Sequence, residues 1–155
     1  MTINPTANLQ SLQGYYLKVA ATALDDVSGN SFAGINNATT LNFTAADATA
    51  PTLSSASPAD NATGVAVGAN IVLTFNENVA AGSGNITLKK SSDNTTVQAM
   101  PVGGGNVSIS GTTVTINPTA DLDSSQGYYL QVAATAIDDT SGNSVSYTHL
   151  TLPTN

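Results

Sequence analysis

An internal repeat constrains the fold of this chain more than any other sequence feature. Residues 2–31 align with residues 115–144 at an offset of 113, and 24 of these 30 positions are identical. Repetition at a fixed period indicates that one structural unit is used again along the chain. We therefore predict a tandem array, in which one near-complete module follows the C-terminal part of an earlier one.

Hydrophobic alternation inside the repeat predicts β-strands. In residues 127–134 a period of two places Tyr128, Leu130, Val132 and Ala134 on one apolar face. Between the copies this segment changes only where Lys18 replaces Gln131, on the opposite face. An alanine-rich helix over residues 19–26 is the alternative, but the preceding tyrosine pair favours a strand. Other apolar side chains alternate in the same way: Ile71, Leu73 and Phe75; Ile86 and Leu88; Val107 and Ile109; Val114 and Ile116.

These short strands are separated by turn-forming segments, and no convincing helix lies between them. Examples of such turns are the residues around Pro58, the Ala-Gly-Ser-Gly stretch at 81–84 and the three glycines at 103–105. Many short strands at this spacing are typical of an antiparallel β-sandwich. The predicted fold class is all-β.

Composition excludes several classes of function. The net charge is −7 and the chain has three lysines and no arginine, so we expect neither nucleic-acid binding nor attraction to anionic membranes. No apolar segment approaches the length needed to cross a bilayer, and no cysteine is present for disulfides or thiolate metal sites. Divalent cations are the natural counter-charge for such an acidic chain.

From residue 50 to residue 144 the sequence resembles the bacterial Ig-like modules of S-layer proteins and large surface adhesins. The resemblance rests on five segments in combination: 57–65 (Ser-Pro-Ala-Asp-Asn-Ala-Thr-Gly-Val), 71–79, 114–118, Leu122 with Tyr128, and 138–143 (Asp-Asp-Thr-Ser-Gly-Asn). The spacing of Leu122 and Tyr128 resembles a tyrosine corner, in which the phenol ties a crossover to the backbone. The resemblance implies an Ig-like antiparallel β-sandwich in an exported protein, extracellular or at the cell surface.

The repeat frame also predicts the domain boundaries. We expect residues 1–46 to be the C-terminal part of a preceding Ig-like module, residues 47–51 a linker, and residues 52–144 a near-complete module. Met1 stands where the second copy has Val114, so we expect the gene to continue upstream, where any signal and anchor would lie.

Identity between the copies ends abruptly after residue 144. Residues 32–42 and 145–155 share one position in 11, and the latter resemble a translated sequencing-library adapter. We interpret residues 145–155 as a non-native tail that lacks the module's own last strand; ordinary divergence of the copies is the alternative. Residues 148–152 alternate suitably, so we expect them to dock as a substitute for that strand.

Catalysis is not expected. The chain has no cysteine and no Gly-x-Ser-x-Gly motif, and its single histidine, His149, lies in the suspect tail. Asp138 and Asp139 would point to opposite sides of an extended strand, which is poor geometry for shared acid–base chemistry. The three glycines at 103–105 are followed by no lysine or helix, so they do not form a phosphate loop.

A calcium site is the one metal centre that the sequence suggests. Asp138, Asp139, Ser141 and Asn143 place several oxygen ligands in one turn, and Asp25, Asp26, Ser28 and Asn30 repeat them. In an Ig-like sandwich this loop shares an end with the loop that holds Glu77, and the linker brings Asp47 to the same end. Oxygen ligands in that number suit Ca²⁺, which would stiffen the junction between modules.

The acidic loop also has an interpretation without calcium, and the module has two candidate functions. Ser-Gly-Asn is a good turn by itself, and the paired aspartates can simply keep the loop solvated. The leading function is a structural spacer whose partners are neighbouring modules of the same chain and an unidentified surface or glycan ligand. The alternative is a carbohydrate-binding module of a secreted enzyme, for which Tyr129 and its counterpart Tyr16 are the only plausible exposed aromatic platform.

Overall fold

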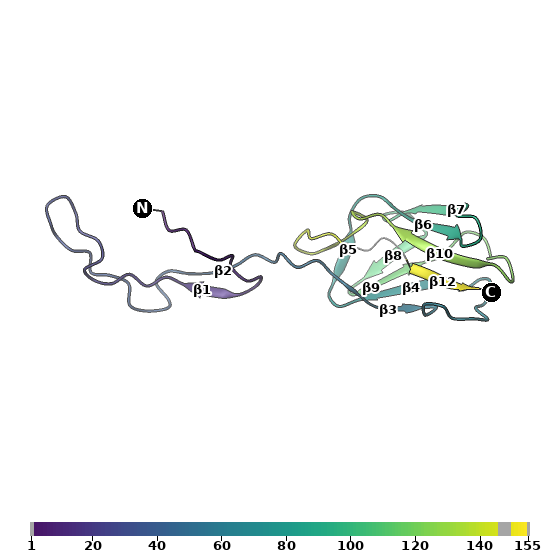
Figure 1. Ribbon diagram of the computed structural model, residues 1–155, viewed down its shortest axis with the longest axis horizontal. Coiled ribbons are helices and arrows are strands. Elements are labelled where there is room, and N and C mark those ends of the chain that lie inside the picture. Colours follow the sequence, from purple (N-terminus) through teal and green to yellow (C-terminus); the bar gives the residue numbers. More distant parts are fainter. Residues whose placement is uncertain (1, 146–149, 155) are drawn as a thin grey trace. The chain divides into compact units, whose positions relative to one another are not determined.

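The structure is a computed structural model that describes residues 2–145 and 150–154. The chain divides into two compact units, Met1–Ala48 and Thr49–Asn155 (Figure 1). The described residues form strands, turns and bends, and none of them is helical. The helical alternative for residues 19–26 is therefore wrong. The predicted strand forms only over Gly14–Tyr16, and residues 19–26 form turns and the isolated bridges Val19–Ile35 and Asp25–Ser31.

The second unit contains two four-stranded antiparallel sheets and a short two-stranded ribbon. The first sheet has the order β3-β4-β9-β8, with strands Leu53–Ser57 (β3), Ile71–Phe75 (β4), Thr113–Ile116 (β9) and Val107–Ser110 (β8). The second has the order β12-β10-β6-β7, with strands Leu150–Thr154 (β12), Gly127–Val132 (β10), Asn85–Lys90 (β6) and Thr96–Pro101 (β7). The ribbon pairs Val79–Ala81 (β5) with Ile137–Asp139 (β11).

One apolar core lies between the two sheets. Each sheet supplies alternate side chains to it, and the largest fully buried ones include Ile71, Leu73, Leu88, Tyr128 and Leu130. Figure 1 shows the two sheets facing each other in this unit. The predicted all-β sandwich and the predicted alternation are confirmed.

The alternation is wrong at one predicted core position. Ala134 was expected on the buried face of its strand, but it is exposed. The strand ends at Val132, and the amide of Ala136 then donates to the carbonyl of Ala133 across 2.9 Å, which closes a turn. Ala136 and not Ala134 is therefore buried.

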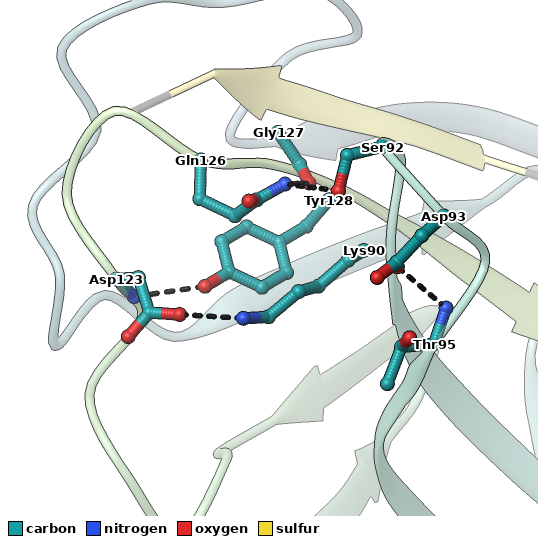
Figure 2. A network of polar contacts seen from close by, with 8 residues as sticks. All are labelled: Lys90, Ser92, Asp93, Thr95, Asp123, Gln126, Gly127 and Tyr128. Carbon is teal, nitrogen blue, oxygen red and sulfur yellow. Dashed lines mark hydrogen bonds and ion pairs between the residues drawn. The ribbon is translucent and has the colours of Figure 1, made fainter.

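The tyrosine corner is present and holds the crossover into β10. The backbone N–H of Asp123 donates to the phenol oxygen of Tyr128 at 2.8 Å (Figure 2). The amide of the preceding Leu122 donates to the carbonyl of Val67. Tyr128 is 1% exposed, so this bond forms where water cannot replace it. The resemblance in the sequence predicted this contact.

A lysine on β6 reaches the same crossover from its solvent side. Lys90 Nζ lies 2.8 Å from Asp123 Oδ2, and this contact is the main reason why the pKa of Asp123 is lowered and that of Lys90 is raised (Figure 2). Both side chains are substantially exposed, so the ion pair adds little stability. It links the crossover to the end of β6 without contributing to the core.

The first unit repeats the local geometry of the second without a comparable core. Gly14–Tyr16 (β1) pairs with Asn42–Thr44 (β2), and the Gln10 amide donates to the Tyr15 phenol at 2.8 Å, as the Asp123 amide does to Tyr128. Leu12 and Ser125, which are equivalent in the repeat, both adopt positive φ, 57° and 59°. These conformations therefore arise from nearby residues alone.

Residues 150–152 of the segment expected to substitute for the last strand do pair with the sheet, in a strand that continues to Thr154. β12 lies antiparallel to β10, with Gly127 opposite Thr154 and Leu130 opposite Leu150. In the first unit, β2 takes the same place beside β1, with Gly14 opposite Thr44. Residues 146–149 and 155 of the predicted tail lie outside the described residues, and its non-native origin remains a prediction.

Truncation of Leu130 should destabilise the second unit strongly. We expect Leu130→Ala to lower its free energy of unfolding by about 2–5 kcal/mol, because the fully buried side chain leaves a cavity between the sheets. Urea denaturation followed by circular dichroism measures the change. The matched control is Leu17→Ala at the equivalent, only half-buried position of the first unit; it should leave this transition unchanged, and an equal loss in both variants would contradict the assignment of the core.

Candidate metal site

The predicted ligand loop begins where β11 ends. The Asp139 amide donates to the Asn143 carbonyl at 2.9 Å, and the Gly142 amide donates back to the Asp139 carbonyl at 3.3 Å. Gly142 has a φ of 90°, a conformation that glycine adopts without strain. The Ser-Gly-Asn sequence therefore closes a tight turn, as the turn interpretation of the sequence requires.

The carboxylate of Asp139 forms the centre of this turn. Its Oδ1 accepts the backbone N–H groups of Ser141 and Asn143 at 2.8 Å each, and its Oδ2 accepts the Asn143 side-chain amide at 2.7 Å. The Asn143 side chain is the largest cause of a lowered Asp139 pKa, and the backbone donors add to it against the opposing effect of burial. Asp139 is only 4% exposed and carries a charge at neutral pH.

Asp138 lies on the opposite side of β11. Its carboxylate accepts the Ser144 hydroxyl at 2.6 Å and lies against the backbone of Gly82, where a β-carbon would come within 2.5 Å of it. The two adjacent acids therefore point to opposite sides of the strand, which is the poor geometry for shared acid–base chemistry that the sequence predicted. The role of Asp138 as a calcium ligand stays a prediction. The contribution of Ser144 and Gly82 was not anticipated, although Ser144 belongs to the repeated stretch.

Glu77 and Asp139 are brought together by the β5–β11 ribbon. Asp139 pairs with Val79, two residues after Glu77, and the two carboxylates have oxygens within 4.8 Å of each other. Two oxygens that bind one Ca²⁺ at 2.3–2.6 Å lie at most about 5 Å apart. This pair has the spacing that a shared calcium ion requires.

The other predicted ligands occupy different places. Ser141 and Asn143 are tied to Asp139 through their backbone amides, and Asn143 also through its side chain, so they serve Asp139 as donors. Asp47 belongs to the first unit, where it accepts the Ser11 hydroxyl at 2.8 Å. Its membership in a metal site stays a prediction.

The equivalent loop of the first unit has the same hydrogen bonds. Asp26 accepts the backbone amides of Ser28 and Asn30 at 2.8 and 2.9 Å, and the Asn30 side chain, which is the main cause of its lowered pKa. Asp25 accepts the Ser31 hydroxyl at 2.6 Å, as Asp138 accepts that of Ser144. Because both copies form this loop, its conformation needs only its own side chains.

The proposed aromatic platform is already engaged in the second unit. Tyr129 is half-buried on β10 opposite Lys89 of β6, and its phenol donates to the side-chain oxygen of Asn94 at 3.1 Å. In the first unit Tyr16 is 54% exposed, and the ammonium group of Lys18 lies 5.5 Å from its ring centroid. The two tyrosines thus differ in exposure and in the cation beside them.

Comparison with known proteins gives the family. The bacterial Ig-like domain family matches residues 47–151, more than half of the chain, and the chain belongs to this family. Domains of this kind are generally non-catalytic and are typical of surface or exported bacterial proteins. No curated protein matches the sequence. Within the described part of the chain, no helix has the length and apolarity to span a membrane.

Acid should weaken the second unit through Asp139. A carboxyl whose pKa is lowered by folding stabilises the protein above its unfolded pKa, about 4, and this contribution is lost as the pH falls through the folded value. In Asp139→Asn the new amide faces the Asn143 amide, donor to donor, so the variant should melt below the parent at pH 7.

The difference between the two melting temperatures should narrow as the pH falls from 6 to 2, which differential scanning calorimetry can follow. Asp26→Asn makes the same change in the first unit and should leave this transition unaffected. If the difference in melting temperature between the parent and Asp139→Asn stays constant over this pH range, Asp139 contributes no charge-dependent stability.

Proposed function

We propose that this chain is a non-catalytic structural module of an exported bacterial surface protein, and that it acts as a spacer. The membership of residues 47–151 in the bacterial Ig-like family carries the proposal, together with a repeated C-terminal portion directly upstream. Modules of one kind in tandem extend a chain by a fixed length per module. The expected location is extracellular or at the cell surface, as in S-layer proteins and adhesins.

The core and the strand pairing of the second unit suit a load-bearing spacer. Its two sheets meet through a continuous core. Strands β4, β8 and β9 of one sheet and β6, β7 and β10 of the other contribute buried side chains, and β3 adds the partly buried Leu53 and Ala56. Backbone pairing across each sheet and the tyrosine corner add cross-links along the strands. Such a domain can bear load without disulfides, which the chain does not contain.

Pulling the full chain by its ends tests the spacer role. We expect the second unit to unfold in one cooperative event that releases roughly 350 Å of chain, since about 100 residues extend by about 3.5 Å each. Single-molecule force spectroscopy measures this length. Unfolding of the second unit in several steps at low force would contradict a load-bearing spacer. Specific glycan-array binding that Tyr129→Ala abolishes would instead assign the module to carbohydrate recognition.

We further propose that Ca²⁺ binds at Glu77 and Asp139. Support comes from the Glu77 and Asp139 carboxylate oxygens, which lie within 4.8 Å of each other, from the lowered pKa of Asp139 and from the net charge of −7. The ion would offset the repulsion between the acids.

Calcium should raise the melting temperature of the second unit if this site exists. A ligand that binds only the folded state stabilises it by about 2.7 kcal/mol at 100 times its dissociation constant. The melt is recorded with and without millimolar CaCl₂, first for the parent chain and then for Glu77→Gln, which should abolish the shift.

Asp60→Asn removes one charge at a distant exposed turn and should keep the calcium shift. No shift in the parent chain would reject the site and leave the loop with its turn role alone.

A further inference from the structure

Two polar side chains, one in each unit, bond to the ends of the linker. The linker follows β2, which ends at Thr44, and it precedes β3, which begins at Leu53. Ser11 of the first unit bonds to its beginning, and Asn76 of the second unit bonds to the residue that follows it. Each of these contacts lies within a single unit.

Ser11 anchors the beginning of the linker through its hydroxyl group. The hydroxyl donates to Asp47 Oδ1 at 2.8 Å and accepts the backbone N–H of Ala48 at 3.0 Å. A serine hydroxyl has one proton and two acceptor positions, so both bonds can form at once. We call this pair of bonds the serine clasp. It joins residues 36 and 37 positions apart in the sequence.

The turn that carries Ser11 is itself held by hydrogen bonds. The Gln10 amide donates to the Tyr15 phenol at 2.8 Å, and the Gln13 amide donates to the Gln10 carbonyl at 3.3 Å. The Gln13 carbonyl accepts the Ala45 amide at 3.0 Å. The serine clasp therefore adds a second contact between this turn and the chain that leaves the first unit.

Asn76 anchors the other end of the linker to the second unit. The Thr52 amide donates to the Asn76 side-chain oxygen at 2.6 Å, and the Asn76 amide donates to the Thr52 carbonyl at 3.0 Å. This reciprocal contact extends the pairing of β3 with β4 by one position beyond Leu53 and Phe75. Between the two anchored residues, Ala48 and Thr52, the chain has only residues 49–51.

Proline chemistry restricts two of these three residues. The ring of Pro51 fixes its φ near about −65°. A residue that precedes proline is kept out of the helical region, so Ala50 favours an extended backbone. This segment therefore has fewer accessible conformations than a glycine- and serine-rich linker of the same length.

We propose that the serine clasp and Asn76 act together as a two-sided anchor of the linker, and that they confine bending between the units to residues 49–51. Loss of either anchor would lengthen the segment that can bend. The anchor does not depend on the spacer role. In a spacer, it would limit the bending of successive modules against each other.

Backbone amide NMR relaxation of the full chain tests both anchors. We expect order parameters of about 0.85, the value of a rigid backbone, at Ala48 and at Thr52. Ser11→Ala should lower the value at Ala48 toward about 0.6, the value of a flexible chain, and leave Thr52 unchanged. Asn76→Ala should lower the value at Thr52 and leave Ala48 unchanged. Values below about 0.6 at either residue of the parent chain would overturn the proposal.

A matched control separates the clasp from a general effect of losing a serine. Ser124 is the repeat equivalent of Ser11, and Ser124→Ala should change neither order parameter. The Val19 amide donates to the Ile35 carbonyl at 2.9 Å and reports whether the first unit keeps its fold. In Ser11→Ala, a loss at Val19 as large as that at Ala48 would assign Ser11 to the fold of the unit and overturn the clasp.

The distance between two spin labels measures the bending directly. The chain has no cysteine, so Val27→Cys and Ser108→Cys introduce one label at an exposed position of each unit. Electron–electron resonance should give a broader distribution of distances in Ser11→Ala than in the parent, and an unchanged one in Ser124→Ala. Equal widths in the parent and in Ser11→Ala would contradict the proposal. Because these measurements apply no load, they test the anchor separately from the spacer role.

Discussion

The burial of one sheet face against another is the constraint on which this molecule depends. A β-sheet with one apolar side is stable only when a second layer covers that side. In the second unit the two sheets provide this cover for each other, and Leu88, Leu130 and Ile116 lose all contact with water. The first unit has the same strand sequence but no second layer, so Ile3 and Leu9 stay exposed. The closed core of the second unit is therefore the part of the chain on which the spacer proposal relies.

Local hydrogen bonds do not depend on a second layer, because they form in both units. The tyrosine corner is made by Tyr15 as well as by Tyr128, and the aspartate-centred turn is made by Asp26 as well as by Asp139. These features link residues at most six positions apart and need no sheet behind them. Nearby sequence therefore sets their shape, whereas the core decides whether water has access to them. The turn also provides an ionised carboxylate beside Glu77, from which the calcium proposal starts.

The sequence was sufficient for the fold because alternation and repetition are both local signals. Alternation placed Leu73, Ile86 and Leu130 in the core, where they lie, but it could not show that the strand stops at Val132, because the turn that closes there depends on backbone bonds from Ala133 to Ala136. The meeting of Glu77 and Asp139 was expected from the order of strands in a sandwich. What the sequence could not show is that Asn143 serves as a donor to Asp139, because an asparagine in a turn can donate or accept equally well.

Hydrogen exchange at two equivalent amides tests most directly whether the core, and not local bonding, confers stability. The Asp139 amide donates to Asn143 and the Asp26 amide donates to Asn30, each across 2.9 Å, but only the former lies in a unit with a closed core. We expect the Asp139 amide to exchange at least about 100-fold more slowly than the Asp26 amide, because it opens only with the surrounding sandwich. Equal protection at the two amides would show that the loop is stable by itself and would contradict this dependence on the core.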